Sequence, residues 1–116
     1  MRIKIKKSKD VQKEAAHGGS GARKLYLTKG ELENKDFEAM THGFLPPHSK
    51  FEWHTHESVE EVLLVLKGTG LVKDRDGEYA YAEGDLFVFP PNVEHEVENP
   101  TGEEQEYIFF RIKVSD

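Results

Sequence analysis

Apolar and polar residues alternate with a period of two along most of this sequence, and turn-forming residues separate the alternating segments. Successive side chains of an extended strand point to opposite faces, so this period indicates β-strands and not helices. Strands are predicted at 23–28, 37–45, 51–56, 61–67, 70–74, 79–82, 86–89, 94–99 and 106–114. Asp76-Gly77 is the strongest hairpin signal, because both residues accept the positive φ of a tight turn. Many short strands with such turns predict an all-β sandwich or barrel.

The length of the chain limits the number of domains that it can form. At 116 residues it has room for one compact domain. We expect a single domain over 1–116, with an N-terminal strand and a glycine-rich loop in 1–22 and the barrel in 23–116. Only residues 10–16 tolerate a helix, and they are too few to change the fold class.

Net charge and cysteine content exclude several classes of function. A formal net charge of −6 repels a phosphate backbone, so nucleic acid is not an expected partner. A sequence without cysteine forms neither disulfides nor a thiolate site. The longest apolar run, residues 62–66, is too short to span a bilayer, and the N-terminus lacks the apolar segment of a signal peptide. We therefore expect a cytoplasmic protein without a membrane partner.

Two predicted strands indicate which side chains face inward. In residues 94–99 the glutamates alternate with His95, Val97 and Asn99, so His95 is expected inside and the glutamates in water. In residues 61–66 both faces are apolar, which indicates a strand that is covered on both sides.

We expect a second copy of the chain to cover the apolar surface on the outside of the barrel. Phe51 and Trp53 alternate with His54 and His56, so they are expected outside the histidine pocket, against a neighbouring sheet or another subunit. Together with the outer face of residues 62–66, they predict a homodimer in which the N-terminal strand packs or exchanges.

A pair of histidines carries the clearest chemistry in the sequence. His54 and His56 lie two apart in an extended segment, so both imidazoles project from one face and can share a metal ion. Further residues follow at fixed distances, namely Glu61, Gly68, Gly84, Pro90, His95 and Asn99. This order and spacing resembles the two signature motifs of the cupin superfamily, a His-x-His pair with a Glu and a Gly, then a Gly, a Pro, a His and an Asn. The resemblance implies a double-stranded β-helix barrel of two antiparallel sheets.

The sequence departs from these motifs at two positions. The first motif usually opens with a glycine six residues before the first histidine, and His48 stands there. The second motif usually has a glycine two residues after its proline, and Asn92 stands there. Asparagine adopts the left-handed conformation readily, so the turn is expected to persist, while His48 places a further imidazole near the expected barrel mouth.

By this resemblance, one divalent transition metal is expected to bind to His54, His56, Glu61 and His95. Three imidazoles and one carboxylate suit iron, manganese, nickel, copper, cobalt or zinc, and they suit calcium poorly. Glu60 is the rival for the carboxylate position, and the motif spacing favours Glu61. Four ligands around an octahedral ion leave two positions open, which is typical of a catalytic site.

The implied fold hosts many activities, so two hypotheses about function stay open. In the first, the chain is a metal-dependent enzyme, an oxygenase or an isomerase, that acts on a small polar molecule. In the second, it binds a sugar or small effector in the same cavity without turnover. A general base beside the ion would favour the enzyme, and the candidates are His42, Glu52 and Tyr81. Met40, His42 and Phe44 share one strand face, which either lines the cavity or belongs to the core.

Overall fold

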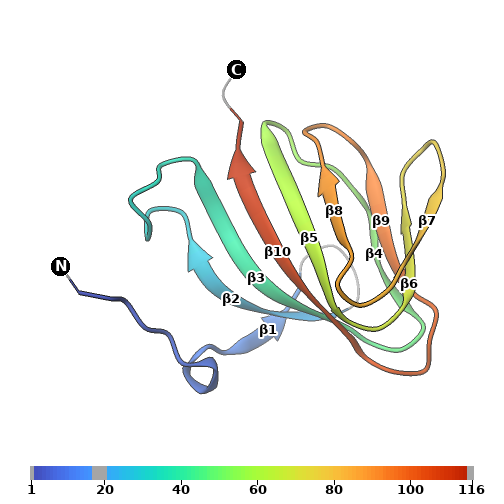
Figure 1. Ribbon diagram of the computed structural model, residues 1–116, viewed down its shortest axis with the longest axis horizontal. Helices are drawn as coiled ribbons and strands as arrows, with labels where there is room; N and C mark the ends of the chain where they lie inside the picture. The colour runs from blue at the N-terminus through green and yellow to red at the C-terminus, as the bar shows by residue number, and fades with distance from the viewer. Residues whose placement is uncertain (1, 17–20, 115–116) are drawn as a thin grey trace.

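The computed structural model describes residues 2–16 and 21–114, and residues 17–20 of the predicted glycine-rich loop lie outside them. Ten strands run through the described residues in antiparallel pairs (Figure 1). They are β1 (Lys13–Ala15), β2 (Ala22–Thr28), β3 (Phe37–Leu45), β4 (Ser49–His54), β5 (Val59–Lys67), β6 (Gly70–Lys73), β7 (Glu78–Tyr81), β8 (Leu86–Phe89), β9 (His95–Asn99) and β10 (Gln105–Lys113). A short 3-10 helix covers Ser8–Asp10. No helix in the described residues is long and apolar enough to cross a membrane.

The strands form two sheets. One has six strands in the order β1-β2-β3-β10-β5-β8, and the other has four in the order β4-β9-β6-β7. Figure 1 shows the larger sheet curving across the view, with the smaller sheet to its right. The core cluster draws on both sheets and consists of Leu45, Phe51, Leu63, Val65, Val72, Tyr81, Phe89, Val97 and Tyr107. Burial of this apolar surface holds the sheets together.

The predicted strands are confirmed, each to within two residues at either end. Residues 10–16 tolerate a helix by sequence, but residues 13–15 form β1, a strand within the N-terminal segment 1–22 that pairs with β2. A helix of one or two turns is unstable on its own, whereas an edge strand satisfies its backbone hydrogen bonds on a sheet that already exists.

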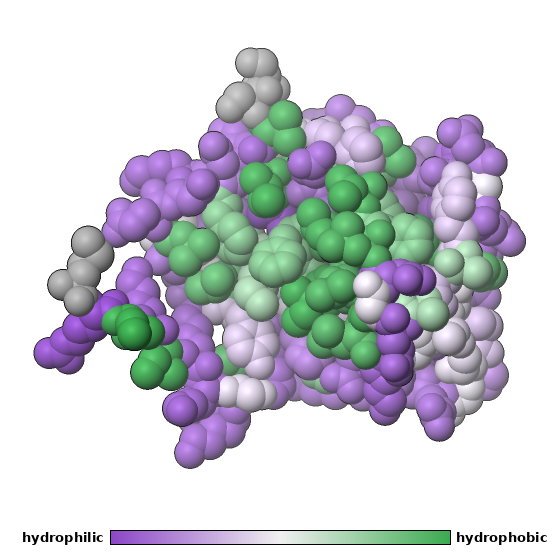
Figure 2. Space-filling model, in the orientation of Figure 1, coloured by the Kyte–Doolittle hydropathy of each residue, from purple (hydrophilic) through white to green (hydrophobic). Residues whose placement is uncertain are grey.

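The outer face of the six-stranded sheet is apolar where β5 lies between β8 and β10. Val62 pairs with Val88 and Leu64 pairs with Leu86, so apolar side chains continue from strand to strand. Leu86 is 56% exposed and Val88 is 50% exposed. Figure 2 shows the resulting continuous hydrophobic area on this face of the molecule. The inner face of β5 is covered as predicted, whereas the predicted cover of its outer face is not supplied by the described residues of this chain.

Glu96 was predicted to face water, but in the structure it is buried. It points away from the barrel interior as the alternation requires, yet only 3% of its surface is exposed. The ammonium groups of Lys50 and Lys73 lie 3.7 Å and 3.8 Å from its carboxylate oxygens. These lysines come from the flanking strands β4 and β6, and their long aliphatic stems cover the carboxylate.

Candidate metal centre

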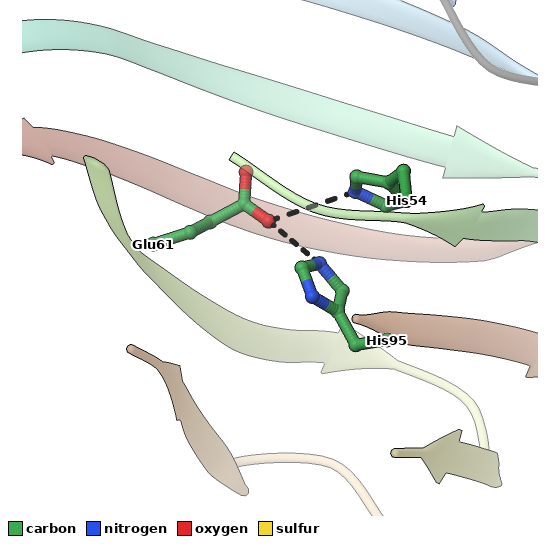
Figure 3. Close-up of side chains that lie close together, drawn as sticks. All are labelled: His54, Glu61 and His95. Atoms are coloured by element: carbon green, nitrogen blue, oxygen red, sulfur yellow. Dashed lines mark hydrogen bonds and ion pairs between the residues drawn. The ribbon is translucent and has the colours of Figure 1, made fainter. Parts of the chain in front are cut away.

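The two sheets bring three of the predicted ligands together. His54 ends β4, His95 begins β9, and the two residues are paired across these neighbouring strands. Glu61 comes from β5 in the opposite sheet and faces the interior, on the same side as Leu63 and Val65. Figure 3 shows the carboxylate of Glu61 reaching between the sheets toward both imidazoles. The paired strand ends and the inward face of β5 thus define a common centre.

The donor atoms of this group lie close together, and two of its three residues are buried. Oε1 of Glu61 lies 3.2 Å from Nε2 of His95 and 4.0 Å from Nε2 of His54. One ligand atom from each residue lies within 4.8 Å of the other two. Glu61 and His95 are 5% and 2% exposed. The arrangement offers two nitrogens and one oxygen to a single ion.

Backbone carbonyls determine which ring nitrogen of each histidine faces the centre. Nδ1 of His54 lies 2.7 Å from the carbonyl oxygen of Glu52, and Nδ1 of His95 lies 3.0 Å from that of Val93. A carbonyl only accepts hydrogen bonds, so each Nδ1 carries the proton and each Nε2 presents its lone pair. The ring of Phe89 stacks on His95 at 3.8 Å between centroids and restrains its tilt.

These tautomers provide a test of whether a metal ion fits the site. With the proton on Nδ1, Nε2 of His95 and Oε1 of Glu61 are two acceptors only 3.2 Å apart. Two lone pairs at that distance repel each other unless a proton or a cation lies between them. Buried imidazole and carboxylate donors of this kind are ligands of divalent transition metals, so the residues present fit such an ion.

His56 stands beside this group in the loop after β4. Its Nε2 lies 3.7 Å from Oε2 of Glu61, and its Nδ1 accepts a hydrogen bond of 3.1 Å from Arg111. Burial lowers the pKa of His56, and the charge of Arg111 lowers it further against the opposing effect of Glu61. Because Nδ1 accepts this hydrogen bond, the proton of the neutral ring lies on Nε2, and coordination through Nε2 requires the other tautomer.

Asn92 connects the two segments that carry the histidines. It adopts a φ of 66°, which confirms the predicted left-handed conformation. Its backbone N–H donates to the carbonyl oxygen of His56 at 3.0 Å. His48 also has a positive φ, of 52°, but its N–H bonds to the carbonyl of Thr101 and it does not line the histidine cavity. His48 therefore contributes no imidazole to the histidine cavity.

A cavity of about 260 Å³ opens beside the candidate ligands. Its lining combines small and aromatic residues with a few polar ones, namely Ala16, Ala22, Arg23, Ala39, Thr41, Gly43, Phe51, His54, His56, Glu61, Phe109 and Arg111. Such a partly apolar cleft with converging polar groups is typical of a small-molecule site.

The structure reverses the predicted face of Phe51. It belongs to the core, with 8% of its surface exposed, and it lines the same cavity as His54. Phe51 pairs with Val97, and His54 pairs with His95, so three steps on β4 correspond to two on β9. The extra residue is a β-bulge, which shifts the alternation by one position. Sequence spacing alone does not reveal it.

The predicted general bases do not line the cavity, and neither does the strand face that carries Met40, His42 and Phe44. Ala39, Thr41 and Gly43 line it instead, because β3 turns the alternate residues inward. His42 bonds to Glu106 at 2.8 Å and stacks on Phe44.

The other two predicted bases have different surroundings. Glu52 is exposed. The hydroxyl of Tyr81 is hydrogen-bonded to Tyr107 and Gln105 in the core. None of the three candidate bases lines the cavity.

Sequence reasoning missed the two arginines of the cavity. Arg111 lies on β10, where its pairing partner on β5 is Glu61. The alternation of Tyr107, Phe109 and Arg111 places all three on one face, and this signal could have identified Arg111 as an inward residue. Arg23 lies on β2, and its Nε donates to Oε1 of Glu14 at 3.0 Å.

Part of the chain is similar in sequence to a known protein. Over 62 residues, the chain is 29% identical to MJ1618, an uncharacterized protein of Methanocaldococcus jannaschii. The match covers 53% of this chain and 50% of that protein, so the chain spans about half the length of the curated relative it matches.

Two solved structures share the fold over nearly the whole chain. A predicted oxalate decarboxylase from Thermotoga maritima superposes with a TM-score of 0.84 at 23% identity, over 96% of this chain and 100% of that one. The polyketide cyclase RemF from Streptomyces resistomycificus gives 0.81 at 16% identity, over 96% and 80%. At such identities the similarity shows the fold, a double-stranded β-helix barrel. The family model of the cupin domain matches residues 42–111, and the chain therefore belongs to the cupin family.

Proposed function

We propose that this protein binds one divalent transition metal through His54, His56, Glu61 and His95 and acts as a metal-dependent enzyme. The observation that carries the proposal is the contact between Glu61 and His95, two buried acceptors 3.2 Å apart that require a cation or a proton between them. The ion is iron, manganese, nickel, zinc, copper or cobalt, the metals that suit imidazole and carboxylate donors.

The residues of the cavity would have distinct tasks in such an enzyme. A bound ion supplies Lewis acidity, which withdraws electron density from a substrate oxygen. Glu52 and Val93 hold the imidazoles of His54 and His95 in one tautomer through their carbonyls. Phe51 and Phe109 exclude water from one side of the cavity. Oxygenation or isomerisation of a small polar molecule fits these roles.

A second candidate function is a module that binds a sugar or small effector in this cavity without turnover. One observation favours it. Apart from the candidate ligands and the arginines, Thr41 is the polar residue in the lining, and a threonine hydroxyl is a poor general base. The names of the two structural neighbours, a predicted decarboxylase and a cyclase, favour the enzyme.

Metal content tests the proposal directly. Protein purified without chelator should contain one divalent ion per chain by elemental analysis. The Tm should fall with EDTA and recover with the ion, since a ligand at a hundredfold excess over Kd stabilises the fold by about 2.7 kcal/mol. His54→Ala, His56→Ala and His95→Ala should each lower occupancy and keep a β-rich circular dichroism spectrum. A metal-free protein whose Tm ignores added divalent ions would refute the site.

A turnover screen separates the two candidate functions. The metal-loaded protein is incubated with small polar metabolites, and products are sought by mass spectrometry. Products that form only with the ion present would support the enzyme. Saturable binding without any product would support the binding module.

We further propose that a second copy of the chain covers the apolar face formed by β5, β8 and β10 (Figure 2). A twofold interface places the same surface against itself, so its centre must lack charge. The pairs Val62–Val88 and Leu64–Leu86 meet this requirement. Cytoplasmic localisation remains a prediction from the cysteine-free sequence.

A further inference from the structure

Arg111 has a buried hydrogen-bond donor, Nε, that no described residue of the cavity uses. One of its terminal nitrogens donates to Nδ1 of His56 at 3.1 Å. Its Nε is buried, lies 4.0 Å from Oε2 of Glu61 and has no hydrogen-bond partner within the described chain. Arg23, the other arginine of the cavity, is different, because its Nε donates to Glu14. A buried guanidinium donor without an acceptor is costly, and a ligand can supply the acceptor.

Metal binding would leave Arg111 with a further free donor. His56 can offer Nε2 to an ion only in the tautomer that carries its proton on Nδ1. In that tautomer Nδ1 no longer accepts the hydrogen bond from Arg111. Coordination by His56 and the present Arg111–His56 contact therefore exclude each other, and a loaded site contains a guanidinium that lacks its acceptor.

The charge of the loaded cavity would favour an anion. Glu61 is the only acid among the described residues of the lining, and the charge of Arg23 is balanced by Glu14. A divalent ion and Arg111 together contribute three positive charges, and Glu61 cancels one of them. The remaining two positive charges attract an anion, and a carboxylate matches the planar fork of a guanidinium.

The rest of the lining restricts the size and polarity of the ligand. Ala16, Ala22 and Ala39 belong to the lining, and their short side chains take up little of the space. At Gly43 a Cβ atom would lie 2.8 Å from the ring of Phe109, so a larger residue would push this wall out of place. A volume of about 260 Å³ with such walls suits a short aliphatic chain.

We propose that the cavity binds a small organic carboxylate and that Arg111 is the residue that selects the carboxylate group. The inference rests on the proposed function, because the excess positive charge depends on the bound ion. It assigns the substrate class to that site, a short-chain carboxylate whose charged end lies beside the ion and Arg111.

Calorimetric titration with two probes of nearly equal shape tests the proposal. Butyrate carries the charge and butyramide does not. Metal-loaded wild-type protein should bind butyrate at least about tenfold more tightly, since a hydrogen bond to a charged group contributes about 1.5 kcal/mol or more. In Arg111→Gln the preference should fall to the part that the ion alone supplies, while metal content by elemental analysis stays unchanged. Lys113→Gln, which removes one charge from an exposed position on the same strand, should keep the preference.

Three results would overturn the assignment. They are a butyrate preference that is undiminished in Arg111→Gln, inorganic phosphate that binds as tightly as butyrate, and a preference unchanged after EDTA removes the ion. Should Arg111→Gln not fold, Arg111→Lys retains the charge without the planar fork, and an unchanged preference there also refutes the role. Failure of the proposed function would appear separately, as wild-type protein that takes up no metal.

Discussion

The loss of stability that follows from replacing Asn99 can be worked out from its hydrogen bonds. Its side chain is fully buried, and Nδ2 donates to the carbonyls of Leu45, Pro46 and Glu103 at 3.1, 2.9 and 2.8 Å. Its Oδ1 accepts from Thr101 and Gln105. Asn99→Asp preserves shape and the accepting oxygen but replaces the NH₂ group by an oxygen. The change removes the two N–H donors of Nδ2, which share the three carbonyls, and two hydrogen bonds at about 1 kcal/mol each give a loss of about 2 kcal/mol, to which repulsion between the carboxylate and the carbonyls adds.

Unfolding in urea, monitored through the fluorescence of Trp53, the only tryptophan in the sequence, measures this loss in the free energy of unfolding. In thermal unfolding the Tm should fall by about 8 °C, at about 4 °C per kcal/mol for a chain of this size. Burial raises the pKa of the new carboxyl group above its unfolded value, so the folded state binds its proton more tightly. The deficit relative to wild type should therefore shrink as the pH falls toward about 4, where the protonated group regains one donor.

Asn34→Asp is the matched control. Asn34 is exposed, and its Oδ1 accepts a hydrogen bond of 2.8 Å from the N–H of Asp36, which an aspartate oxygen also accepts. The same change of charge should there alter the free energy of unfolding by less than about 0.5 kcal/mol. Equal losses in both variants, or a loss at Asn99 that does not shrink in acid, would show that the donated hydrogen bonds are not the cause.

Three further predictions concern the site, the core and the outer face. Glu61→Gln should lower metal content, and Glu60→Gln should leave it unchanged, because the two side chains point to opposite faces of β5; the reverse result would place the wrong carboxylate at the ion. Burial raises the pKa of Tyr81 to about 12 and that of Tyr107 higher still, so both stay protonated in the fold when the unfolded chain ionises. Stability in urea should thus decrease above about pH 10, and a flat profile would contradict this. Val88→Glu should convert a dimer to a monomer near 13.3 kDa by light scattering, and a wild-type monomer at micromolar concentration would refute the dimer.

The positions of the strands could be predicted because their signal is local. Alternation within each segment and turn residues such as Asp76-Gly77 require no knowledge of the partner strands. The same holds for Asn92, whose tolerance of positive φ is a property of its own side chain. The inward orientation of Glu61 and His95 followed from the alternation of β5 and β9 in the same way.

Contacts between distant segments could not be predicted from the sequence. Residues 13–15 form a strand because the edge of β2 is available, and the sequence contains no local sign of that edge. Glu96 is buried because lysines from β4 and β6 cover it. Asn99 was recognised as a motif residue, and only the fold shows that it connects the ends of β3 and β9 to the loop before β10.

The sequence by itself determined the fold class, the strands and the spacing of the candidate ligands, because each depends on residues close together in the chain. Only the tertiary structure decided the composition of the cavity. The bulge in β4 turns Phe51 inward, and pairing of β10 with β5 places Arg111 beside Glu61. Both depend on the register between strands, and register is a property of two segments that no single segment encodes.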